Sequence, residues 1–318
     1  MTRHEVKSQS AIKNRTEKLE GKSFFGGTAY LGIPSNKKFK QLVFEGINRY
    51  GLNFGASRNS NLTLDIFSTA EHQAAKRSGA EAAIIVSSGY LAAQLVVQNY
   101  TTSHRFIYAP ETHPALWIGK PNPPKMSFSE WAEKTVEEVN KSNDDVLLIT
   151  NSVNNLLPEI YEFDWLTNVH SGRKLTLLID DSHGIGIIGQ NGEGSYSRVT
   201  KLPNISLVVV SSMAKALGVD AGLILSTEKM IARLRTSPIY SGASPPSPGV
   251  LYAYANALDI YKRELEKLRL NMQFFIGLVV VSHSVNYVND FPVFLLKNPD
   301  ASERLMSEGI SISSFGSG

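Results

Sequence analysis

Lys215 stands where a side chain can do chemistry, because it follows the apolar run of residues 206–211 almost directly. An ε-amino group at the end of a buried strand, partly removed from water, can have a lowered pKa and form an imine with an aldehyde. Ser212, three residues earlier, could add a hydroxyl donor at the same place. A lone lysine after a strand is more often solvated, so this position indicates imine chemistry only if other groups that such chemistry needs are also present.

A second apolar run, residues 175–180, ends in the acidic pair Asp180 and Asp181, and His183 follows. Sheets of α/β proteins place ligands at strand ends, and side chains alternate along a strand, so only one acid can face the crevice. Acids at such a position also serve as turn or helix-cap residues, and the pattern alone leaves both interpretations open.

A third run, residues 82–87, passes through Ser88, Gly89 and Tyr90 into a predicted helix. Exposed backbone N–H groups and the positive end of the helix dipole make such a turn an anion site. An ordinary strand-to-helix turn with a serine N-cap explains the same residues equally well.

Pyridoxal phosphate needs these three groups together: an imine-forming lysine, an anionic partner for its protonated ring nitrogen, and a phosphate site. The chain supplies Lys215, Asp180 and the turn at residues 88–90, each in a separate strand-to-helix unit. His113 could lie flat on the cofactor ring, although loop histidines more often satisfy only local hydrogen bonds. We therefore predict pyridoxal 5'-phosphate as the cofactor.

Bringing these groups together requires a sheet. Apolar runs alternate with amphipathic stretches, which predicts an α/β fold with mainly parallel strands at residues 82–87, 105–109, 146–150, 175–180 and 206–211. Helices are expected at residues 62–78, 90–98, 128–142 and 248–271. We expect an N-terminal segment at 1–45, a large cofactor-binding domain at 46–255, and a small α+β domain at 256–318 on which the N-terminal segment packs.

Composition narrows the classes of partner. The 318 residues carry 32 Lys and Arg against 29 Asp and Glu, a net charge of +3 that gives no reason to expect nucleic acid. The absence of cysteine excludes thiolate metal sites, and no metal is expected. The longest apolar run, residues 274–281, is too short to span a membrane, and the polar N-terminus lacks a secretory signal, so we expect a cytoplasmic protein.

The motifs resemble, in the same order, those of the α-oxoamine synthases, a pyridoxal-phosphate-dependent family with the aminotransferase class I/II fold. The segments that carry the resemblance are SSGY at 87–90, THPAL at 112–116, IDDSHGIG at 179–186, SSMAKALG at 211–218 and YSGASPP at 240–246.

The resemblance implies that Lys215 holds the cofactor as a Schiff base and that Asp180 pairs with the pyridine nitrogen. It further implies the remaining cofactor contacts: His113 on the ring, His183 near the phenolic oxygen, and Ser88, Gly89, Tyr90 and Ser212 lining the pocket, with Ser241 reaching a neighbouring subunit's phosphate. The implied assembly is a homodimer, and the implied reaction joins a small amino acid to an acyl-CoA thioester with loss of CO2.

Departures from the family keep other activities open. Leu62-Thr63-Leu64 and Phe67 stand where the family has a substrate-facing histidine. The chain also stops before the family's carboxylate-binding arginine, so the small domain looks truncated, and we expect weak binding of free amino acids unless Arg58 or another cation substitutes. Transamination on the same scaffold is the first alternative and a non-catalytic partner subunit the second. A Rossmann-type dehydrogenase is disfavoured because no Gly-x-Gly-x-x-Gly follows the early strands.

Overall fold

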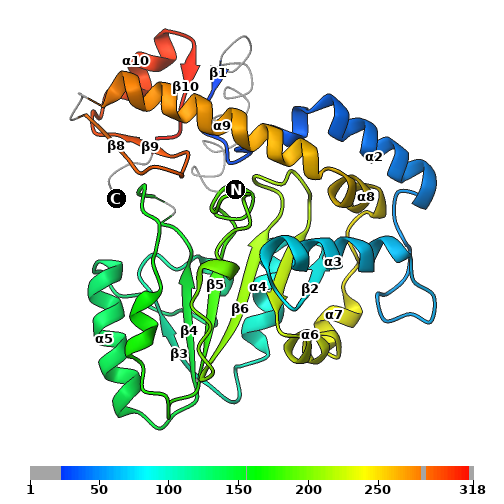
Figure 1. The fold of residues 1–318 in the computed structure, drawn as a ribbon, viewed down its shortest axis with the longest axis vertical. Helices are drawn as coiled ribbons and strands as arrows, with labels where there is room; N and C mark the ends of the chain where they lie inside the picture. Colours follow the sequence, from blue (N-terminus) through cyan, green and yellow to red (C-terminus); the bar gives the residue numbers. More distant parts are fainter. Residues whose placement is uncertain (1–22, 155, 281–283, 315–318) are drawn as a thin grey trace, which may run out of the picture.

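The computed structural model describes residues 23–154, 156–280 and 284–314. Its centre is a six-stranded sheet in the order β2-β7-β6-β5-β4-β3, drawn in the lower half of Figure 1. The strands are β2 (Ala82–Val86), β3 (Arg105–Tyr108), β4 (Val146–Asn151), β5 (Leu175–Asp180), β6 (Ile205–Ser212) and β7 (Gly222–Ser226). All five strands predicted from the apolar runs are present, with each end within one residue of its prediction.

The sheet is mixed because it contains an antiparallel strand, β7, which the sequence analysis did not predict. The neighbouring pairs from β3 to β6 are parallel, as expected, whereas β7 runs antiparallel to both β6 and β2. Only residues 213–221 connect β6 to β7, which is too short for the crossover that a parallel neighbour would require. The segment that carries Lys215 is therefore a tight connection between two adjacent strands.

Helices cover both faces of the sheet, because successive side chains of each strand point to opposite sides. Leu177 and Ile179 pack in one apolar cluster with α3 (Asp65–Ser78) and α5 (Phe128–Lys141). Leu178 packs in the other with α4 (Gly89–Gln98), α6 (Glu228–Arg235) and α7 (Pro238–Gly242). The helices predicted at 90–98 and 128–142 are confirmed within one residue, and the one expected from residue 62 begins at Asp65.

The prediction of a single helix at residues 248–271 is wrong both in its continuity and in its end. The structure has two helices there, α8 (Pro248–Asn256) and α9 (Leu258–Val279), which meet at Ala257. Ala257 has φ −102° and ψ 17°, outside helical geometry, and it is fully buried, so tertiary packing rather than a Pro or Gly makes the break. The apolar run that starts at Phe274 extends α9 by two turns instead of opening a new element.

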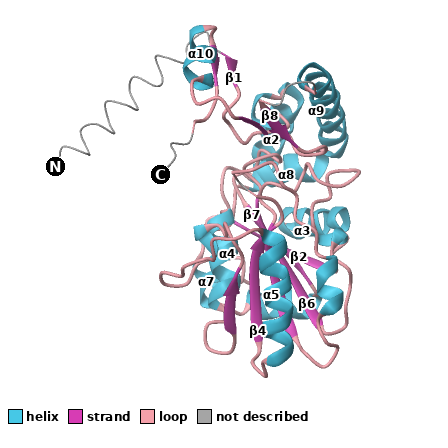
Figure 2. Ribbon diagram, turned by 90° about the vertical axis from the view of Figure 1, so that its left-hand side faces the viewer, coloured by secondary structure: helices cyan, strands magenta, loops and turns pink. Residues whose placement is uncertain are grey.

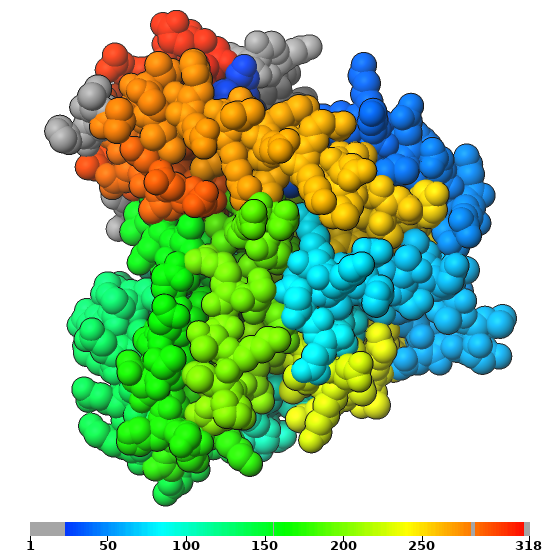
Figure 3. Space-filling model, viewed as in Figure 1, coloured from blue at the N-terminus to red at the C-terminus, as the bar shows by residue number. Residues whose placement is uncertain are grey.

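Helix α9 crosses the upper part of the molecule and connects the sheet domain to a small lobe (Figure 1). In the space-filling view the helix forms a continuous band above the surface of the sheet domain (Figure 3). Beside it α2 (Lys37–Tyr50) packs on α8, where a Cβ on Gly46 would lie 2.5 Å from the Gly249 carbonyl oxygen. Within the described ranges, no helix has both the length and the apolarity to cross a membrane.

The small lobe lies at one end of the molecule (Figure 2). It consists of the antiparallel pair β8 (Val285–Tyr287) and β9 (Phe294–Leu296), then α10 (Ala301–Ser307) and β10 (Ile310–Ser311). Strand β1 (Ser23–Phe24) pairs in parallel with β10, which brings residues 23 and 24 to the lobe. Residues 1–22 lie outside the described part, and the domain limits at 45 and 255 stay predictions. Short 3-10 helices complete the chain: η1 (Ile33–Ser35), η2 (Pro114–Leu116), η3 (Asp164–Asn168) and η4 (Tyr196–Arg198).

Candidate active site

The carboxyl ends of three neighbouring parallel strands, β4, β5 and β6, carry the polar residues of the site. Asn151 at the end of β4 stands opposite Asp180 at the end of β5, and Asp180 stands opposite Val210 of β6. Lys215 follows three residues after the end of β6. The sheet therefore brings Asp180 and the lysine segment to one edge, where sheets of this kind bind ligands.

Lys215 lies in a connection that is anchored on both sides. Met213 donates its backbone N–H to the Ala221 carbonyl over 2.9 Å, and Val219 donates to the Met213 carbonyl over 3.0 Å. Gly218 has φ +65°, and a Cβ there would lie 2.6 Å from Ile33, so the turn requires glycine. Burial lowers the pKa of the Lys215 ammonium, and the carboxylate of Asp180 opposes that effect. A lysine of this kind has more neutral amine available for imine formation than a solvated one.

Asp180 and Asp181 have different environments, as their alternation along the chain predicts. Asp180 is half-buried, and its Oδ1 accepts a hydrogen bond from the Ser182 backbone N–H over 2.9 Å. Asp181 is fully buried, and its Oδ2 accepts from the Ser195 N–H over 2.9 Å. Burial raises the pKa of Asp181 to about 7. A Cβ on Gly184 or Gly194 would lie 2.1 and 2.2 Å from its oxygens, so Asp181 is enclosed by backbone and only Asp180 is near Lys215.

His183 contacts Tyr30, and the charges of Lys215 and Asp180 act on its pKa. Burial and the Lys215 charge lower the pKa of His183 to about 4, while Asp180 acts in the opposite direction. The imidazole is therefore neutral near pH 7. Its Nδ1 lies 2.7 Å from the Tyr30 hydroxyl, and the Tyr30 ring is 6.3 Å from that of Phe291, at the small lobe. Burial raises the pKa of Tyr30 to about 12, so the phenol keeps its proton.

His113 is held by an asparagine that sequence reasoning missed. The His113 backbone N–H donates to Asn151 Oδ1 over 3.3 Å, and Asn151 Nδ2 donates to the Glu111 carbonyl over 2.7 Å. Glu111 has φ +55°, an uncommon conformation for a residue other than glycine, and this bond stabilises it. The imidazole Nδ1 accepts from the Ala115 N–H over 3.1 Å, and His113 itself is exposed. The signal for Asn151 was a polar residue at the last position of a buried strand.

The turn at residues 88–90 is an N-capped start of α4, and its use as an anion site stays a prediction. Ser88 caps α4, because its Oγ accepts from the Leu91 N–H over 3.1 Å. A Cβ on Gly89 would lie 2.6 Å from the Cβ of Ser212, so the start of α4 is pressed against the end of β6. The Ser212 N–H donates to Ser182 Oγ over 2.7 Å, which ties that strand end to the segment after Asp180. Tyr90 is 65% exposed and borders this place.

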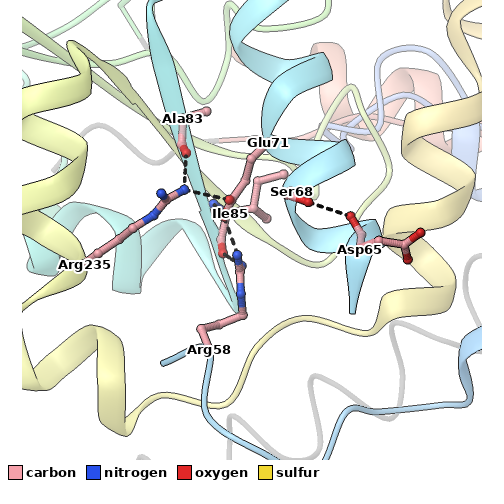
Figure 4. A network of polar contacts seen from close by, with 7 residues as sticks. All are labelled: Arg58, Asp65, Ser68, Glu71, Ala83, Ile85 and Arg235. Carbon is pink, nitrogen blue, oxygen red and sulfur yellow. Dashed lines mark hydrogen bonds and ion pairs between the residues drawn. The ribbon is translucent and has the colours of Figure 1, made fainter. Parts of the chain in front are cut away.

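Two other sequence-predicted residues lie elsewhere in the hydrogen-bond network. Ser241 Oγ accepts from Asn59 Nδ2 over 2.7 Å, and its carbonyl accepts from Ser57 Oγ over 2.7 Å. These bonds join Ser241 to the turn at residues 57–59 rather than to Lys215. Arg58 does not serve as a free cation, because its Nη1 pairs with Glu71 over 3.0 Å and its side chain is only 8% exposed. Figure 4 shows the pair.

The groups present fit pyridoxal phosphate. A lysine of lowered pKa, a carboxylate, a neutral half-buried histidine and a helix N-terminus that packs against a strand end occur together, and these are the donors and charges that the cofactor needs.

Comparisons with known proteins agree with this fit. A family model described as aminotransferase class I and II matches residues 124–278. A putative 8-amino-7-oxononanoate synthase of Trichodesmium erythraeum is 26% identical over 330 residues, covering 96% of this chain and 84% of the relative. The 8-amino-7-oxononanoate synthase of Chromohalobacter salexigens is 26% identical over 252 residues, covering 76% of this chain and 64% of the relative. Against several such relatives, the match spans less than two thirds of their length.

Solved structures show the same fold. Serine palmitoyltransferase of S. paucimobilis superposes with a TM-score of 0.76 at 18% identity, covering 92% of this chain and 80% of that one. An 8-amino-7-oxononanoate synthase of Francisella tularensis gives a TM-score of 0.69 at 20% identity, covering 94% and 90%. With the sheet topology, these similarities show that the chain has the fold of the pyridoxal-phosphate-dependent transferases and is similar in sequence to 8-amino-7-oxononanoate synthases.

Proposed function

We propose that this chain holds pyridoxal phosphate on Lys215 and joins a small amino acid to an acyl-CoA thioester with loss of CO2. The observation that carries the proposal is the placement of Asp180 at the end of β5, with His183 three residues after it, and of Lys215 three residues after the end of the neighbouring strand β6. The names of the relatives, 8-amino-7-oxononanoate synthase and serine palmitoyltransferase, support this reaction class.

Each residue has a distinct task in this proposal. Lys215 would hold the cofactor, and its lowered pKa would provide the neutral amine that imine formation requires. Asp180 would supply a negative charge to the ring nitrogen, and neutral His183 and His113 would be further contacts of the ring. When bound, the cofactor provides an electron sink for the bonds broken at the amino-acid carbon.

The phosphate site in this proposal is the start of α4. The Ser88, Gly89 and Tyr90 backbone lies at the positive end of the helix dipole, and Ser212 adds a hydroxyl from the end of β6. Ser241 is proposed to reach the phosphate of a second copy in a homodimer. Sedimentation of the protein with bound cofactor tests this, and a monomer at micromolar concentration with cofactor still bound would refute it.

Transamination is the second candidate, and one observation favours it. Phe67 stands where the family has a histidine that faces the substrate, and it is fully buried, 5.7 Å from the Phe54 ring and 4.4 Å below the Arg58 guanidinium. That position therefore belongs to the apolar core and offers no proton donor. Lys215 and Asp180 serve both reactions equally.

Absorption spectroscopy with peptide mapping tests the proposal. Adding pyridoxal phosphate should produce a visible band, and borohydride reduction should fix the cofactor on Lys215. Lys215→Ala should abolish the band, whereas Lys174→Ala, at the opposite end of β5 and exposed, should retain it. Labelling spread over surface lysines would overturn cofactor binding. Release of CoA and CO2 from an amino acid and an acyl-CoA supports condensation, and formation of a 2-oxo acid supports transamination.

A further inference from the structure

Strand β2 is an outer strand of the sheet, with β7 on one side and no strand of the described chain on the other. Backbone groups on such an edge need partners from elsewhere when they are buried. Ile85 of β2 is fully buried, so its outward N–H and carbonyl must be satisfied by other parts of the structure.

Three charged side chains lie along this edge, two of them bonded to the Ile85 backbone and one to the Ala83 carbonyl (Figure 4). Glu71 Oε1 accepts from the Ile85 N–H over 3.0 Å. Arg58 Nη1 donates to the Ile85 carbonyl over 3.4 Å and to Glu71 Oε1 over 3.0 Å. Arg235 Nη2 pairs with Glu71 Oε2 over 2.9 Å and lies 3.5 Å from the Ala83 carbonyl. We call Arg58, Glu71 and Arg235 the edge triad.

Glu71 is the centre of the edge triad. Its side chain is 5% exposed and that of Arg58 is 8% exposed, so this pair lies out of water. The Arg58 guanidinium is also confined between aromatic rings, with Phe67 at 4.4 Å and Tyr240 at 5.9 Å. Loss of the Glu71 charge would leave two guanidinium groups together without their shared counter-ion, which is costly in a buried place.

The edge triad connects two segments that are proposed to contact phosphate. On one side, the chain continues from β2 into Ser88 and Gly89, three and four residues after Ile85. On the other side, the Asn59 Nδ2 group binds both the Arg235 carbonyl, over 2.9 Å, and Ser241 Oγ, over 2.7 Å. Arg58 lies in that same turn. The start of α4 and the Ser241 segment are thus braced against one carboxylate.

We propose that Glu71 is a positioning residue for the phosphate monoester of the cofactor, which sets residues 88–89 and Ser241 in place without touching the ligand. The inference rests on the proposed cofactor. It predicts that the edge triad matters for a ligand with a phosphate and not for the same ligand without one.

The test compares pyridoxal phosphate with pyridoxal on Glu71→Gln. The amide keeps the shape and still accepts from the Ile85 N–H, but it removes the charge between the arginines. We expect at least tenfold weaker binding of pyridoxal phosphate, with pyridoxal binding changed less than twofold. Arg235→Lys keeps the positive charge on the half-exposed side of Glu71, so this variant should retain most of the affinity of the unchanged protein for both ligands. Glu133→Gln, on the exposed face of α5, is the matched control.

Amide hydrogen exchange of the cofactor-free protein gives a second measurement. Residues 85–89 should exchange faster in Glu71→Gln than in the Glu133→Gln control. An equal loss of affinity for both ligands in Glu71→Gln, or no change in the affinity for either, would overturn the inference. If Glu71→Gln fails to fold, Arg235→Gln should give a smaller loss specific to pyridoxal phosphate, and an unselective loss there would also overturn it. Failure of the unchanged protein to bind either ligand at Lys215 would instead contradict the proposed function.

Discussion

Replacing Asp181 by asparagine removes a titrating group from the interior without removing its hydrogen bond. Asp181 is fully buried, and its Oδ2 accepts from the Ser195 N–H, which an asparagine Oδ1 can also do. The Ser152 hydroxyl, which opposes the effect of burial on the pKa, can accept from the new amide N–H. The variant therefore isolates the cost of ionising one buried carboxyl.

The magnitude follows from the two pKa values. Burial raises the pKa of Asp181 from 3.8 to about 7 in the folded protein. Between these values the unfolded chain has lost its proton and the folded chain has kept it, so stability is greatest below pH 3.8 and falls as the pH rises. At 1.36 kcal/mol per unit, Asp181 costs the protein about 2.7 kcal/mol between pH 5 and pH 7.

Urea unfolding of both proteins at pH 5 and pH 8 measures this cost. The free energy of unfolding of Asp181→Asn, relative to the unchanged protein, should rise by roughly 2 to 3 kcal/mol between the two pH values. Asp164→Asn, an exposed position, should show no such rise. A difference between Asp181→Asn and the unchanged protein that stays constant with pH would mean that the Asp181 carboxyl is ionised when buried, and the reasoning would be refuted.

Other substitutions test the site directly. Gly89→Ala places a Cβ 2.6 Å from Ser212 and should cost about 1 to 3 kcal/mol of stability together with cofactor affinity, whereas Gly277→Ala in open space on α9 should stabilise by about 0.5 to 1 kcal/mol; equal effects in thermal unfolding would contradict this. Tyr30→Phe keeps the ring against Phe291 and loses the bond to His183, so urea unfolding should show a loss of about 1 kcal/mol, and a loss above 3 kcal/mol would point to packing instead. Asp180→Asn should lower the pKa of Lys215 further, so that the visible band forms at lower pH, while most activity is lost; an unshifted pH profile would separate Asp180 from Lys215.

The sequence was sufficient for elements whose stability comes from continuous burial. The runs that became β4, β5 and β6 are apolar at nearly every position, because helices cover both sheet faces. Strand β7 escaped prediction because its place between β2 and β6 depends on pairing distant in sequence. The break at Ala257 also has no local cause, since neither Pro nor Gly is present and the residue is fixed by its buried surroundings.

The residues of the site also fall into those that the sequence predicts and those that depend on contacts between distant segments. Asp180 and Lys215 were predictable, because a polar side chain directly after a buried strand has few positions available. The contact of Tyr30 with His183 spans 153 positions of sequence, and nothing near either residue indicates it. The role of Glu71 as the partner of an edge strand required knowledge that β2 lies at the edge of the sheet.

The two buried acids near the site, Asp181 and Glu71, predict opposite results for the same chemical change. Asp181 accepts a backbone N–H, and no cation appears among the groups that shift its pKa, so replacement by the neutral amide removes a penalty that grows above pH 3.8 and is complete above about pH 7. Glu71 lies between Arg58 and Arg235, so Glu71→Gln leaves positive charge without its counter-ion. Removing one partner of a buried ion pair costs on the order of 3 kcal/mol, and the exposure of Arg235 makes this an upper value.

At pH 8, urea unfolding should therefore show Asp181→Asn more stable than the unchanged protein and Glu71→Gln less stable. Changes of the same sign in both variants would show that burial alone, and not the arginine partners, sets the energetics of these carboxyls.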